Sequence, residues 1–180
     1  YHASSEEDDV GGLAIFIKKK LGVTKVHNTV LFSIGEDTVD RSHENYFSMG
    51  RNLQCIEFTN FEKIYTVLNF HGMWIANRKD DTEKRIEQSK IVRKIFNDSN
   101  GAKILCGDFN IDPDTESLRI LTEGNINLVQ KYGTVSTRSI SKKRQEVVDY
   151  VVTSPEIKIR DFFVPIVDVS DHLPLMLEFE

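Results

Sequence analysis

The sequence predicts an α/β protein in which sheets form the core and helices cover them. Most apolar segments have the length of a strand, and turn residues separate them. Two longer segments have apolar or capping patterns typical of helices and lie between strand-like segments, as crossover helices do. The chain has 180 residues and is 39% hydrophobic, enough for one domain with a buried core. We therefore expect a single domain over residues 1–180, with its chemistry in loops at the strand ends.

The N-terminal part of the chain is expected to consist mainly of strands. Apolar runs of strand length occur at 13–17, 26–34, 53–58 and 64–70. The first run follows two glycines and is expected to be a buried strand. The stretch 35–50 is polar and unpatterned, which predicts a long surface loop. A turn at 60–62 separates the last two runs, so they should form an antiparallel pair.

Helix and strand signals alternate in the rest of the chain. Thr82 opens a segment with apolar positions at helical spacing, namely Ile91, Val92, Ile95 and Phe96. A strand is expected at 102–106. Pro113 is typical of the first turn of a helix, which Gly124 should end. Three further strands are expected at 147–153, 162–167 and 175–179.

Composition and charge exclude several function classes. The net charge of −5 and the pI near 5.6 provide no general attraction to nucleic acid, so such a role would need a local basic patch. No apolar run is long enough to cross a bilayer, and we expect no membrane partner. The acidic first residues lack the pattern of a secretory signal. Cys55 and Cys106 lie in apolar stretches and are expected to be buried, reduced thiols, which favours a cytoplasmic location.

Four short polar clusters follow or begin strand-like runs. They are 69–72 (NFHG), 107–110 (GDFN), 149–150 (DY) and 170–174 (SDHLP). Polar side chains at the ends of neighbouring strands can converge in one cleft. Carboxylates can hold a hard cation, imidazoles can move protons, and an amide can orient water. The four clusters together therefore predict a site for phosphoester chemistry.

In this order and spacing, GDFN, the DY after a valine pair, and the terminal SDHLP resemble the endonuclease/exonuclease/phosphatase family, and NFHG stands where many members carry their first histidine. The resemblance covers most of the chain. It implies a DNase I-like four-layer α/β sandwich, in which helices flank two packed, mostly antiparallel sheets. It also implies an enzyme that hydrolyses phosphoester bonds by activated water, as a phosphodiesterase or nuclease does. Its expected partner is a phosphoester substrate, with nucleic acid among the candidates.

The resemblance implies roles for three residues of the last two clusters. His172 would be the general base or the imidazole that stabilises the transition state. Asp149 would orient and charge it, since a neighbouring carboxylate raises the pKa of a histidine. Asp171 would be a metal ligand. Mg²⁺ is the expected ion because it prefers oxygen ligands, and Mn²⁺ could replace it.

In the first two clusters, Asp108 would position or deprotonate the attacking water, and Asn110 would orient the water or the phosphate. His71 would donate a hydrogen bond to a non-bridging oxygen as negative charge builds. Each residue also has a structural interpretation. Asp108 and Asn110 are typical turn and capping residues, and His71 could simply end a strand. The co-occurrence of the clusters favours the functional interpretation.

Other residues carry weaker signals. Arg138, Lys142 and Arg144 lie in a loop before the Asp149 strand and could contact substrate phosphates, although such a charge run is more often a solvated loop. Trp74, which follows the His71 cluster, could stack on a base or a sugar.

The sequence departs from the family pattern at its beginning. Members open with a strand that carries an asparagine, followed later by a strand whose glutamate is a principal metal ligand, and neither is recognisable here. We therefore expect an N-terminally truncated domain, with another chain as one possible source of the missing strands. The alternative function is a catalytically inactive member that acts as a binding or interaction module. An unrelated α/β domain with accidental motifs is the third and weakest interpretation.

Overall fold

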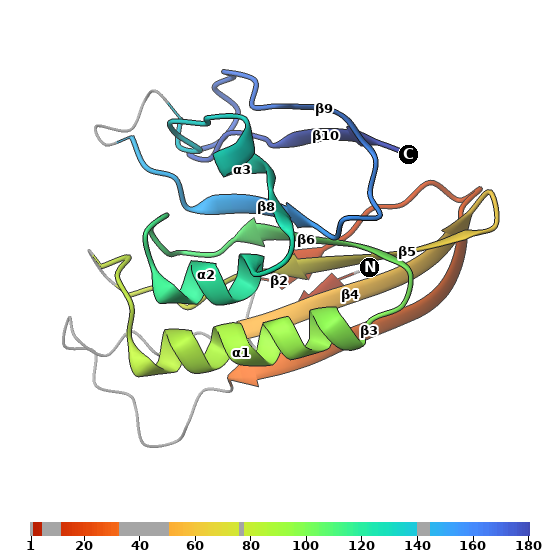
Figure 1. Ribbon diagram of the computed structural model, residues 1–180, viewed down its shortest axis with the longest axis horizontal. Coiled ribbons are helices and arrows are strands. Elements are labelled where there is room, and N and C mark those ends of the chain that lie inside the picture. The colour runs from red at the N-terminus through yellow and green to blue at the C-terminus, as the bar shows by residue number, and fades with distance from the viewer. Residues whose placement is uncertain (1, 5–11, 33–50, 76–77, 140–144) are drawn as a thin grey trace.

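A six-stranded mixed sheet forms the centre of the computed structural model of the chain (Figure 1), which describes residues 2–4, 12–32, 51–75, 78–139 and 145–180. The predicted loop at 35–50 lies outside these residues. The order of strands across the sheet is β3-β4-β5-β6-β8-β7, and only β5 and β6 pair in parallel. The strands are β3 (Gly22–Phe32), β4 (Arg51–Asn60), β5 (Lys63–Phe70), β6 (Ala102–Asp108), β7 (Ile126–Asn127) and β8 (Asp149–Thr153).

Two small antiparallel sheets accompany the large one. The first pairs β1 (His2–Ser4) with β2 (Gly12–Ala14) and contacts β4. The second pairs β9 (Ile159–Phe163) with β10 (Met176–Phe179), and its Phe179 packs edge-on against Tyr65 of β5, with ring centroids 5.7 Å apart. Both small sheets pack against strands of the large sheet, which is therefore the structural frame of the domain.

The helices are α1 (Glu83–Asp98), α2 (Glu116–Thr122) and α3 (Leu128–Lys131). Thr82 caps α1, since its side chain accepts a hydrogen bond from the amide of Arg85 at 3.2 Å. Figure 1 shows α1 and α2 next to each other on one face of the large sheet. One part of the core lies between that face and the helices, and includes Leu53, Leu68, Leu105, Val92, Phe96, Leu118 and Leu121.

The predicted hairpin of β4 and β5 is confirmed. Leu53 pairs with Phe70, and the two strands remain in register to Asn60 and Lys63. Phe61 and Glu62 form the turn, and both have positive φ angles, 47° and 64°. A two-residue turn of this kind matches the twist of the paired strands, which explains why the connection is so short.

Several predicted boundaries are wrong. The run at 13–17 is not a buried strand, because β2 ends at Ala14 and no described residue covers Phe16, which is 94% exposed. The strand predicted at 162–167 ends at Phe163, because Pro165 has no amide hydrogen to donate to a sheet. The second helix begins at Glu116, not near Pro113, since Thr115 provides the N-cap. The sequence also did not predict β7 or α3, which are too short to show a period.

The two cysteines are free, as predicted, but they are half-buried and not fully buried. None of the helices in the described part of the chain has both the length and the apolar character needed to cross a bilayer.

Candidate functional site

Three strand ends meet at one edge of the large sheet. Strands β5 and β6 run in parallel and end side by side, and β8 begins at the same edge because it is antiparallel to β6. Asp108 and Asp149 are direct partners in the β6–β8 register. Like charges in that position destabilise a sheet. Neighbouring cations are therefore needed to offset the repulsion between these two carboxylates.

Close backbone contact brings the ends of β5 and β6 together. The amide of Gly72 donates to the carbonyl of Asp108 at 2.7 Å, and a Cβ on Gly72 would lie only 2.0 Å from the carbonyl oxygen of Phe109. This spacing excludes any side chain at Gly72. It places His71 beside Asp108, with 3.9 Å between Nε2 and Oδ2.

His172 and Asp149 form a hydrogen-bonded pair. Nδ1 of His172 lies 2.9 Å from Oδ2 and 3.0 Å from Oδ1 of Asp149, so Nδ1–H donates to the carboxylate. Nε2 then faces Oδ2 of Asp108 at 3.8 Å. Buried Thr137 fixes this pair, because its carbonyl accepts from Leu173 and its hydroxyl accepts from the amide of Asp149 at 3.2 Å.

Asp108 and Asn110 combine the structural and the functional interpretations. The amide of Asn110 donates to Oδ1 of Asp108 at 2.9 Å, and Asn110 has a left-handed φ of 56°, as expected for a tight turn after a strand. Oδ2 of Asp108 remains directed at the two histidines. The turn therefore aims one carboxylate oxygen at the site.

The environment shifts the two histidines in opposite directions. Burial, with help from the charge of Arg51, lowers the pKa of His71 to about 4, although its side chain is 43% exposed and water screens part of this effect. The hydrogen bond to Asp149 raises the pKa of His172. Burial and the neighbouring Asp149 raise the pKa of Asp108. Opposite shifts of this kind are a signature of acid and base assignments in an active site.

Arg138 contacts two of the predicted site residues. Its Nη1 lies 3.2 Å from Oδ2 of Asp171 and also contacts Nε2 of His172. A guanidinium can only donate, so Nε2 of His172 accepts in this contact. The side chain of Asp171 is 52% exposed and does not join the cluster of Asp108, Asp149 and His172. Its role as a metal ligand stays a prediction.

The structure places the remaining candidates less informatively. Trp74 is half-buried in the loop after β5. Lys142 and Arg144 lie outside the described residues. Sequence reasoning missed Lys79, whose Nζ lies 2.5 Å from Oδ1 of Asn110, and Arg51, a buried cation near His71. Lys79 belongs to no motif, and the only signal was its place in the charged loop after His71.

A divalent cation fits the donor set of this site. Asp108, Asp149 and His172 each offer a ligand atom, and these atoms lie within 4.8 Å of one another. Two opposed carboxylates are suited to Mg²⁺ or Mn²⁺, which take oxygen ligands and keep several waters. His172 is the least suitable of the three, because both of its ring nitrogens already have partners.

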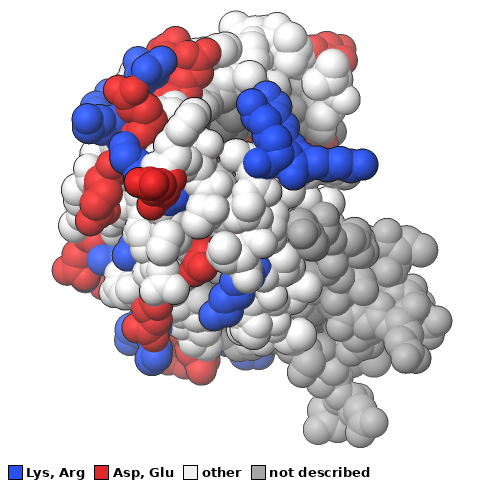
Figure 2. Space-filling view, turned by 90° about the vertical axis from the view of Figure 1, so that its right-hand side faces the viewer, with Lys and Arg blue, Asp and Glu red and all other residues white. Residues whose placement is uncertain are grey.

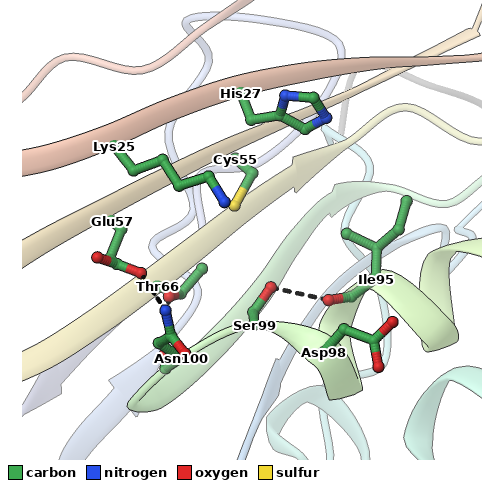
Figure 3. A pocket seen from close by; sticks show the side chains of 9 residues that line it. All are labelled: Lys25, His27, Cys55, Glu57, Thr66, Ile95, Asp98, Ser99 and Asn100. Atoms are coloured by element: carbon green, nitrogen blue, oxygen red, sulfur yellow. Dashed lines mark hydrogen bonds between the residues drawn. The ribbon is translucent and has the colours of Figure 1, made fainter.

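A separate cavity of about 180 Å³ lies at the opposite end of the strands, near the start of β6. Figure 3 shows Lys25 and His27 of β3 and Cys55 and Glu57 of β4 facing the C-terminal end of α1. Glu57 accepts from the side-chain amide of Asn100 at 2.9 Å and from Thr24. The cavity is therefore distinct from the cluster of Asp108, Asp149 and His172.

Comparison with known proteins identifies the family and the fold. The family model of the Endonuclease/Exonuclease/phosphatase family matches residues 1–172. A structure from Bacteroides vulgatus, described as an endonuclease/exonuclease/phosphatase, has a TM-score of 0.70 at 17% identity, over 100% of this chain and 75% of its own. A mannosyl-6-phosphatase from Bacteroides thetaiotaomicron has a TM-score of 0.59 at 17% identity, over 89% and 67%.

TDP2 from D. rerio, in a complex with a single-strand DNA product, has a TM-score of 0.66 at 14% identity, over 89% of this chain and 68% of its own. These likenesses show the DNase I-like α/β fold. No curated protein matches the sequence. The match of the family model over nearly the whole chain, together with the fold, shows that the chain belongs to the endonuclease/exonuclease/phosphatase family.

Proposed function

We propose that the chain hydrolyses phosphoester bonds by metal-assisted attack of water on phosphorus. The observation that carries this proposal is the hydrogen-bonded pair of His172 and Asp149, with Nε2 of His172 3.8 Å from Oδ2 of Asp108. Family membership supports the general chemistry. The names of two structural neighbours, a mannosyl-6-phosphatase and a protein bound to a DNA product, are consistent with it.

In this mechanism Asp108 orients the water and takes its proton. Burial suits it to this role, because a raised pKa makes a carboxylate a stronger base. The water oxygen forms the new bond to phosphorus, and the ester P–O bond breaks with its electron pair on the leaving oxygen. His172, charged with the help of Asp149, donates a proton to that oxygen or a hydrogen bond to the phosphoryl group. Neutral His71 donates to a second phosphoryl oxygen.

Asp108 and Asp149 would hold the metal ion, with Asp171 as a further ligand if Arg138 releases it. A bound Mg²⁺ or Mn²⁺ supplies Lewis-acid stabilisation of the phosphoryl charge. Arg138 has a role in the same step. When phosphate takes its guanidinium, Nε2 of His172 becomes free to react.

The substrate proposed is a phosphodiester of broad type, including single-stranded nucleic acid. Among the described residues on the face shown in Figure 2, basic and acidic side chains are interspersed on the left, and one small group of basic side chains lies at the upper right, so no basic surface extends across this face. Together with the net charge of −5, this pattern argues against avid binding of duplex DNA.

The test is hydrolysis by the purified chain with Mg²⁺ or Mn²⁺ of three substrates: bis(p-nitrophenyl) phosphate, p-nitrophenyl phosphate and single-stranded DNA. We expect turnover that chelation abolishes and that His172→Ala lowers by about 10²- to 10⁴-fold. Lys90→Ala, on the exposed face of α1, is the control variant. Absence of turnover on all three substrates with both metals would refute the proposal.

A second candidate is a binding module without catalysis. The observation that favours it is the ion pair between Arg138 and Asp171, which occupies a predicted metal ligand. Calorimetric titration with Mn²⁺ separates the two candidates. Site-specific binding that Asp108→Asn weakens supports the enzyme, whereas absence of both metal binding and turnover supports the module.

A further inference from the structure

The segment between the β5 loop and α1 presents a lysine to the catalytic cluster. Nζ of Lys79 lies 2.5 Å from Oδ1 of Asn110. Asn110 in turn donates its backbone amide to Oδ1 of Asp108 at 2.9 Å, so a single residue links Lys79 to that carboxylate. Lys79 is therefore part of the electrostatic environment in which a phosphate would bind.

A buried arginine fixes the backbone on both sides of Lys79. Arg85 is 1% exposed, and its guanidinium donates to the carbonyls of Arg78 at 2.9 Å and Asp80 at 2.5 Å. It also donates to the carbonyl of Met73 at 3.2 Å. Burying a cation is costly unless it is fully hydrogen-bonded, so this arrangement commits a buried guanidinium to holding the loop.

The same segment is tied to α2 from its other side. Oδ2 of Asp81 accepts from the amide of Glu116 at 2.7 Å, and Oδ1 accepts from the amide and the hydroxyl of Ser117. The carbonyl of Lys79 itself accepts from the amide of Asp112 at 3.0 Å. With its backbone held at each of these points, Lys79 has little freedom to turn away from the site.

The ammonium group has hydrogen-bonding capacity beyond its present contact. It carries three N–H donors, and among the described residues its one hydrogen-bond acceptor is Asn110. The group is half-buried, and burial lowers its pKa, so the charge is held in place at a desolvation cost. A phosphate oxygen would accept a hydrogen bond from one of the remaining N–H groups, and this charge-assisted bond would offset the desolvation of the ammonium group.

We propose that Lys79 binds a non-bridging oxygen of the substrate phosphate and thereby holds the phosphorus next to Asp108. This inference rests on the function proposed for the site. In the competing interpretation, Lys79 only holds the side-chain carboxamide of Asn110 in place and never contacts substrate. The two interpretations differ in what happens to phosphate binding when the charge is removed.

The experiment titrates inorganic phosphate into the metal-free chain by calorimetry. Lys79→Gln keeps a hydrogen-bond donor for Asn110 and removes the charge, and Lys90→Gln makes the same charge change on the exposed face of α1. A charge-assisted hydrogen bond contributes enough to change affinity by about 10- to 100-fold. We expect Lys79→Gln to weaken phosphate binding by that factor, Lys79→Arg to restore much of it, and Lys90→Gln to stay close to wild type.

Thermal unfolding of all variants checks that the fold is retained. Equal phosphate affinity of wild type and Lys79→Gln would overturn the inference, as would the absence of phosphate binding by wild type. Lys79-dependent phosphate binding without any hydrolysis would support the inference and contradict the proposed function. Hydrolysis with a KM and kcat that Lys79→Gln leaves unchanged would support the function and overturn the inference.

Discussion

Replacing Asp149 by asparagine tests the pairing on which the proposed chemistry depends. The substitution keeps the shape of the side chain and its acceptor oxygen, so His172 can remain in place. It removes the negative charge that lies 2.9 Å from Nδ1. The site would then keep its geometry and lose the charge that favours the imidazolium form.

The expected size of the effect follows from what surrounds His172. The hydrogen bond to Asp149 is the largest cause of its raised pKa, and the charge of Asp149 adds to it. After the substitution, burial and Arg138 lower the pKa of His172, and only Asp108 among the principal causes still raises it. The pKa of His172 should therefore fall. Loss of a positioned proton donor typically reduces the rate by about 10²- to 10⁴-fold, and we expect kcat to fall within that range.

The assay combines a pH profile of kcat/KM with histidine titration by two-dimensional NMR. In the Asp149→Asn variant, the His172 resonance should titrate at lower pH. Both limbs of the profile should move to lower pH, because the charge of Asp149 raises the pKa of Asp108 as well as that of His172. Asp98→Asn is a matched control, because the Asp98 side chain is 63% exposed and lies at the far end of α1. A rate and a His172 pKa that both match wild type would refute the assigned pairing.

Three further predictions concern His172, Arg85 and Gly72. The folded-state pKa of His172 is raised above its unfolded value. Its contribution to stability is therefore complete below about pH 6.5 and is lost as pH rises through the folded pKa. Urea unfolding should show that His172→Asn is more destabilising at about pH 5.5 than at about pH 9. Arg85→Leu leaves buried carbonyls without donors and should cost about 3 kcal/mol in the free energy of unfolding, and a cost near zero by urea titration would contradict the role of Arg85. Gly72→Ala should prevent folding, measured by circular dichroism, or abolish turnover, because its Cβ would overlap the carbonyl of Phe109. The control Gly124→Ala has open space around it and should lose only about 1 kcal/mol in the free energy of unfolding, through its positive φ.

The sequence predicted that polar residues next to apolar strands can converge, and the structure brings His71, Asp108 and Asp149 to one edge of the sheet. Their roles in catalysis stay predictions. Lys79 could not be identified in this way, since what directs it to Asn110 is the hydrogen bonding of Arg85. Lys79 and Asn110 lie far apart in the sequence, so no local sequence pattern predicts the contact between them.

Strand boundaries were harder to predict for a related reason. The apolar residues of 13–17 and 162–167 have the composition of buried strands, yet Phe16 is 94% exposed and Ile166 is 71% exposed. The amino-acid composition of a segment indicates that it can form a strand, but its burial depends on which other segments pack over it. The hairpin of β4 and β5 was predictable because its partner strand and its turn both lie within the local sequence.

The charges around the site explain why the overall net charge was a poor guide to its chemistry. Asp108 and Asp149 oppose each other at one edge of the sheet, and three cations act on the same cluster, namely Lys79, Arg138 and Arg51. Each cation is wholly or partly withdrawn from water, so its field acts at short range on a compact anion and is screened less than that of a surface charge. A phosphoryl group at this position would therefore be held mainly by side chains inside the cluster. Under the proposed function, recognition of the phosphate would then not depend on an extended basic surface around the site.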